Sequence, residues 1–150
     1  MLSKVVLIIS ATVFLLLGVF YFTTDKSYQD SFEARFYYFV GNYKKAYEFA
    51  DKSYSLNPYN KMAFTVLVQS KIALDYANYI QMGNRYFKKI DEISSKKEYK
   101  DADKIRVKLM CEIMLGEYKK LSPTKLTNID LIENAKKMNE KFERLYKELF

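Results

Sequence analysis

A run of residues that carries no charge lies near the start of the chain. Residues 5–22 contain three hydroxyl groups but no Asp, Glu, Lys or Arg, and the nearest charged side chains are Lys4 and Asp25. These 18 residues would span about 27 Å as a helix, at about 1.5 Å per residue. That length approaches the roughly 30 Å hydrocarbon core of a bilayer. The run therefore predicts a transmembrane helix, and we expect residues 1–24 to form a membrane anchor.

A cleaved signal peptide is the alternative interpretation of this run, but such a peptide normally ends in small residues at its cleavage site. Residues 18–22 read Gly-Val-Phe-Tyr-Phe, which favours an uncleaved anchor. The positive charges on the two flanks are nearly balanced, with Lys4 on one side and Lys26 and Arg35 on the other. Because a short N-terminus usually stays inside, we expect a single-pass protein of the inner or plasma membrane. Residues 25–150 would then lie outside the cytoplasm, in the periplasm, although the cytoplasmic orientation stays open.

Helical periodicity dominates the rest of the chain. From Gln29 onward, apolar residues recur every three or four positions, whereas the alternation typical of strands is missing. Gly41 and Pro58 interrupt the pattern, and a proline cannot continue a helix. Beyond Pro58 we expect one helix over residues 60–74 and another that begins near Tyr76. The pattern predicts an all-α fold.

A short motif occurs twice at expected helix boundaries. Residues 41–46 read Gly-Asn-Tyr-Lys-Lys-Ala, and residues 116–121 read Gly-Glu-Tyr-Lys-Lys-Leu. A weaker copy surrounds Tyr76, so that Tyr43, Tyr76 and Tyr118 are separated by 33 and 42 residues. The first spacing is close to the period of about 34 residues that is typical of one class of helical repeat.

Residues 27–60 resemble a tetratricopeptide repeat (TPR). Ala34 and Ala46 would let two antiparallel helices approach closely, and Gly41 would supply the turn between them. The second and third units match the pattern less completely. The resemblance implies a TPR-like antiparallel array of helical hairpins, with residues 128–150 as a C-terminal capping helix. An unrelated helical bundle is the alternative.

The composition limits the chemistry that the chain can perform. It contains no His, and Cys111 is its only cysteine, which excludes imidazole-based catalysis and an intramolecular disulfide. No Gly-rich phosphate loop occurs. The net charge of +7 would attract acidic partners, but the lysines are spread over the whole chain rather than gathered in one stripe. We therefore expect no enzyme activity, no cofactor, no metal, no small-molecule substrate and no nucleic acid.

The family resemblance implies a partner-binding groove lined by the first helix of each hairpin. An aromatic and aliphatic groove with two arginines would suit an amphipathic helix or an acidic segment of another protein. The seven groove residues that the resemblance implies are Arg35, Tyr38, Phe39, Gln69, Ile72, Arg106 and Met110.

By family analogy, the expected function is that of a membrane-anchored, chaperone-like interaction module. Such a module is a scaffold or assembly factor for a membrane complex, for example in a flagellar motor, its stator or a secretion machine. The alternative is a structural subunit of a membrane-associated oligomer.

Overall fold

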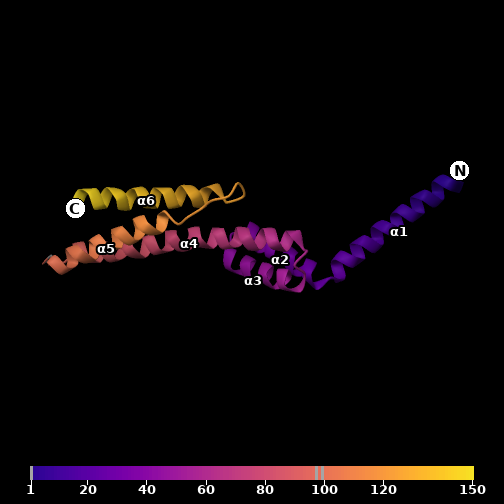
Figure 1. Ribbon diagram of the computed structural model, residues 1–150, viewed down its shortest axis with the longest axis horizontal. Helices are drawn as coiled ribbons and strands as arrows, with labels where there is room; N and C mark the ends of the chain where they lie inside the picture. Colours follow the sequence, from indigo (N-terminus) through magenta and orange to yellow (C-terminus); the bar gives the residue numbers. More distant parts are fainter. Residues whose placement is uncertain (1, 97, 99) are drawn as a thin grey trace. The chain divides into compact units, whose positions relative to one another are not determined.

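Helices form nearly all of the structure, a computed structural model that describes residues 2–96, 98 and 100–150, without the side chains of residues 2, 3 and 21–23. The described residues form six helices and no strand, which confirms the all-α prediction (Figure 1). The helices are α1 (Leu2–Thr24), α2 (Lys26–Phe39), α3 (Tyr43–Leu56), α4 (Lys61–Ser94), α5 (Asp101–Tyr118) and α6 (Ile129–Leu149). They divide into two compact units, and the boundary between the units along the chain falls between Ser70 and Lys71, within α4.

The predicted transmembrane helix is corrected by the structure. Among the described residues, none of the helices combines the length and the apolarity that crossing a bilayer requires. The predictions of a membrane anchor at residues 1–24, of membrane contact through residues 5–22 and of a single-pass membrane location are therefore not supported.

In the first unit, α2 and α3 form an antiparallel hairpin (Figure 1). Ala34 on α2 and Ala46 and Ala50 on α3 are completely buried, because their small side chains allow the two helices to approach closely. Gly41 joins the helices at a φ of 79°, a conformation that a Cβ would strain. The next amide, that of Asn42, donates to the Tyr37 carbonyl at 2.9 Å and closes the end of α2. Gly41 therefore supplies the turn of this hairpin, and the small side chains of the two helices allow their close packing.

Ala46 provides a direct test of how tightly this hairpin is packed. Its side chain has no exposed surface, so the larger side chain of Ala46→Leu must displace its neighbours in α2. We expect the substitution to lower the free energy of unfolding by about 1–3 kcal/mol, the usual cost of overpacking. Urea unfolding, monitored by circular dichroism, measures the change. Lys44→Leu, which introduces leucine at an exposed position of the same helix, is the control.

A buried polar cluster closes the other end of the hairpin. The Ser27 hydroxyl donates to the Ser53 carbonyl at 3.0 Å, and the Ser53 hydroxyl donates to the Ser27 carbonyl. The Asn60 amide donates to the Ser27 hydroxyl at 3.0 Å, while its oxygen accepts the amides of Met62 and Ala63 in the first turn of α4. Asn60 therefore connects the start of α4 to both helices of the hairpin.

The second unit contains residues 71–94 of α4 together with α5 and α6. Phe142 of α6 is fully buried and stacks on Phe87 of α4, with 4.2 Å between the ring centroids. Gly83 lets α6 approach α4, because a Cβ at this position would lie 2.6 Å from the sulfur of Met138. The expected C-terminal cap is therefore part of the core of this unit.

Two expected helix boundaries are wrong. The structure forms a single helix, α4, where we expected separate helices over residues 60–74 and from Tyr76. Residues 71–80 contain neither Gly nor Pro, so nothing in this stretch ends a helix. Similarly, α5 continues through Gly116 to Tyr118. The antiparallel hairpin of α2 and α3 thus occupies the segment with the best resemblance, whereas α4 has no turn at the second copy of the motif.

Candidate protein-binding surfaces

A stripe of exposed aromatic side chains runs along α2. Phe32, Phe36 and Phe39 have exposed fractions of 57%, 60% and 88%, and Val40 beyond them is 54% exposed. Residues three and four apart lie on the same face of a helix, so these side chains form one continuous surface. We call Phe32, Phe36, Phe39 and Val40 the α2 stripe.

The hairpin core holds this surface in place from behind. Tyr37 of α2 stacks on Phe49 of α3, with 5.4 Å between their centroids, and Tyr38 meets the ring of Tyr43 edge-on at 5.5 Å. Burial raises the pKa of Tyr38, with a smaller contribution from the neighbouring Tyr43 phenol. Because these inner rings fix the rotation of α2 against α3, the phenylalanines of the α2 stripe are turned to solvent.

The α2 stripe is comparable in size to the largest apolar patch on a typical monomeric protein. Its three phenylalanines expose about 400 Å² together, if each ring side chain presents about 200 Å² in full. The largest patch on a typical monomeric protein measures about 300–600 Å² and is often functional. A contiguous aromatic patch of this size makes the α2 stripe a candidate interaction surface.

Four of the seven expected groove residues lie in the first unit. Arg35 is exposed beside the α2 stripe and has one Nη 4.0 Å from the sulfur of Met62, and Phe39 is the most exposed residue of the stripe. Tyr38 and Gln69 are half-buried. Sequence reasoning missed Phe32 and Phe36 because their spacing also fits a buried helix face.

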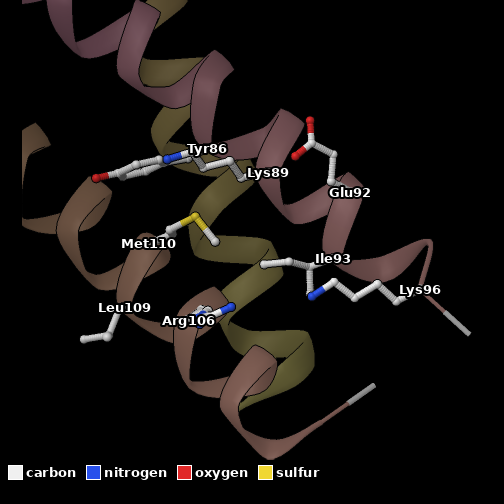
Figure 2. Close-up of a pocket in the computed structure, with 8 residues that line it drawn as sticks. All are labelled: Tyr86, Lys89, Glu92, Ile93, Lys96, Arg106, Leu109 and Met110. Atoms are coloured by element: carbon white, nitrogen blue, oxygen red, sulfur yellow. The ribbon is translucent and has the colours of Figure 1, made fainter. Parts of the chain in front are cut away.

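The remaining three expected residues lie in the second unit. Arg106 and Met110 line a cleft of about 540 Å³ between α4 and α5, whereas Ile72 packs against the core of this unit. Figure 2 shows the cleft with all eight of its lining side chains. Those that sequence reasoning missed are Tyr86, Lys89, Glu92, Ile93, Lys96 and Leu109. We call this space the α4–α5 cleft.

A buried carboxylate organises the cations of the α4–α5 cleft. Asp103 is 4% exposed, and its Oδ1 lies 2.9 Å from the Lys96 Nζ and 3.7 Å from an Nη of Arg106. The hydrogen bond from Lys96 is the main cause that lowers the pKa of Asp103. One carboxylate therefore restrains two cations at the edge of the cleft.

The lowered pKa of Asp103 predicts a pH dependence of stability. A carboxyl group whose pKa is lower in the folded state stabilises the protein above its unfolded pKa, near 3.9, and loses this contribution as the pH falls through the folded value. We expect Asp103→Asn to lower the urea midpoint at pH 7 and to lose this effect as the pH falls below about 4. Asp101→Asn, at an exposed position on the same helix, is the control. A gap between Asp103→Asn and the parent that stays constant from pH 7 to pH 2.5 would contradict the ion-pair assignment.

The described residues offer neither an activated cysteine nucleophile nor a cluster of metal ligands. Cys111 is fully buried, and burial, with a smaller effect of Glu112, raises the pKa of its thiol to about 11. Because the thiolate is the reactive form, a buried thiol with this pKa is a poor nucleophile. Within residues 2–96, 98 and 100–150, no group of three His, Cys, Asp or Glu side chains could hold a metal ion.

No protein-family model, curated protein or solved structure matches this chain.

Proposed function

We propose that this chain is a protein-binding module that holds another polypeptide on its helical surface. The observation that carries the proposal is the α2 stripe, a row of more than half-exposed phenylalanines on one helix face. Aromatic side chains are enriched where proteins bind one another, because they bury much area and lose little conformational freedom.

An amphipathic helix or an acidic segment is the partner that suits the α2 stripe. The stripe follows a helix for about two turns, so a second helix can lay its own apolar face along it. Arg35 at the edge of the stripe favours a carboxylate on the partner. A role as scaffold or assembly factor for a larger complex, including the flagellar and secretion machines named above, rests on the family resemblance alone.

A structural subunit of an oligomer is the second candidate function. The apolar side chains of α1 favour it, because the consecutive residues Leu7, Ile8 and Ile9 are 68%, 67% and 57% exposed and, at 3.6 residues per turn, point to different sides of the helix. Sedimentation velocity of the purified chain distinguishes the two candidates. If the chain is a structural subunit, it self-associates at low micromolar concentration. Polar substitutions of the exposed apolar residues in α1 then prevent this self-association, whereas polar substitutions in the α2 stripe do not.

Site-specific photocrosslinking tests the protein-binding function. A photoreactive phenylalanine analogue replaces Phe39 in the cells that make the protein, and in a parallel variant it replaces Tyr59. Tyr59 is 91% exposed and lies in the turn between α3 and α4. We expect a discrete crosslinked protein from position 39 only.

The double substitution Phe32→Ser with Phe36→Ser is the second part of the test. Both side chains are more than half exposed, so their loss leaves the core of the hairpin intact. We expect it to abolish the crosslink from position 39 while the unfolding midpoint of the chain changes little. A crosslink that persists in the double variant, or one that forms equally from position 59, contradicts the proposal.

A further inference from the structure

We propose that the α4–α5 cleft is a docking site for an acidic amphipathic helix, one that inserts an apolar side chain between α4 and α5 and places carboxylates against the cations around it. This inference rests on the proposed protein-binding function and assigns it a second site with a defined charge preference. The α2 stripe and the α4–α5 cleft belong to different units of the chain and share no residue.

The interior of the cleft is apolar. Met110, which is 9% exposed, forms part of the core of the second unit and also lines the cleft, and the half-buried Ile93 faces it from α4. Figure 2 shows both side chains directed into the space between the two helices. A volume of about 540 Å³ accommodates one or two large apolar side chains, within the range of binding pockets in general.

The charges around this interior are mainly positive. Lys89, Lys96 and Arg106 line the cleft, against one lining carboxylate, that of Glu92. In Figure 2 the Glu92 carboxylate projects away from Met110 and Ile93, whereas Arg106 extends toward them. The cations therefore dominate the field that an entering side chain meets.

The ion pairs leave part of this positive charge available. Lys96 and Arg106 share the single Oδ1 of Asp103, and Lys89 has no ion pair with any residue that the structure describes. The second unit as a whole contains 18 basic and 13 acidic residues. An acidic helix is thus attracted at long range and meets unpaired donors at the cleft, whereas a basic helix of the same shape is repelled.

A set of three synthetic helices tests the charge preference with the full chain. Each 18-residue peptide carries the same leucine face, and its polar face contains Glu, Gln or Lys. Fluorescence anisotropy measures their dissociation constants at about 150 mM salt, where long-range attraction is screened beyond about 8 Å. We expect the Glu peptide to bind at least tenfold more tightly than the Gln peptide. We expect no binding of the Lys peptide or of a Glu peptide whose leucines are replaced by Ser.

Two matched charge reversals locate the site. Lys89 lines the cleft, whereas the neighbouring Lys88 is exposed on the same helix and does not. We expect Lys89→Glu to weaken binding of the Glu peptide about tenfold, or about 1.4 kcal/mol, relative to Lys88→Glu. Both variants change the net charge equally, and neither removes an ion pair among the described residues, so we expect the stability of the chain to stay unchanged.

The α2 stripe serves as the reference that separates the two proposals. If Phe32→Ser with Phe36→Ser abolishes binding of the Glu peptide while Lys89→Glu and Lys88→Glu have equal effects, the cleft assignment fails and the protein-binding function stands. If the Glu, Gln and Lys peptides bind equally, the charge preference fails. If position 39 gives no crosslinked protein and the Glu peptide does not bind, both proposals are overturned.

Discussion

Replacing Phe142 by Ala is expected to lower the free energy of unfolding by about 3–5 kcal/mol, the usual cost of truncating a fully buried phenylalanine. Among the side chains that the structure describes, Phe142 is the largest with no exposed surface, and its ring stacks on that of Phe87 with 4.2 Å between the centroids. Its removal leaves a cavity where α6 meets α4, and the close approach at Gly83 leaves the helices little room to collapse into it. Urea unfolding monitored by circular dichroism at 222 nm measures the loss.

Leu149→Ala provides the matched control for this truncation. Leu149 lies on the same helix, two turns beyond Phe142, and is 43% exposed. We expect it to cost less than about 1 kcal/mol, because exposed substitutions rarely exceed that value. Equal losses in the two variants would show that α6 does not pack through Phe142, and the second unit would then need a different core.

The periodicity of the sequence predicted the helices well, and the turns only where a residue enforces them. Gly41 and Pro58 mark real helix ends, because glycine adopts positive φ and proline cannot continue a helix. The boundary expected near Tyr76 rested on a spacing of 33 residues and not on a helix-breaking residue. The apolar pattern runs through this point without interruption, so the chain forms the continuous helix α4.

The candidate surfaces could be predicted only in part, since exposure is a tertiary property. Arg106 and Met110 are four residues apart on α5, so helical spacing alone places them together. Lys89 and Ile93, which complete the cleft from α4, depend on how α4 packs against α5. Phe36 has the spacing of a core residue, and only the packed hairpin shows that this residue faces solvent.

Replacing Asn60 by Ala is expected to lower the free energy of unfolding by about 2–4 kcal/mol, from two losses that occur together. The side chain is 1% exposed, and its oxygen accepts the amides of Met62 and Ala63, both at 3.1 Å, as the N-cap of α4. Its NH₂ group donates to the hydroxyls of Ser27 and Ser31 at 3.0 and 3.3 Å. Loss of the cap alone costs about 1 kcal/mol, and leaving buried polar groups without partners costs about 1–3 kcal/mol more.

Asn128→Ala separates these two losses, because Asn128 caps α6 through one bond to the Asp130 amide at 2.8 Å and is itself exposed. That variant removes a helix cap without disturbing a buried cluster, so its expected cost is about 1 kcal/mol. The excess cost of Asn60→Ala, measured from urea midpoints of both variants, is then the contribution of the cluster that joins α2, α3 and α4. If the two variants lose the same stability, the buried serines find other partners, and the start of α4 is attached to the hairpin by apolar contacts such as Val66 alone.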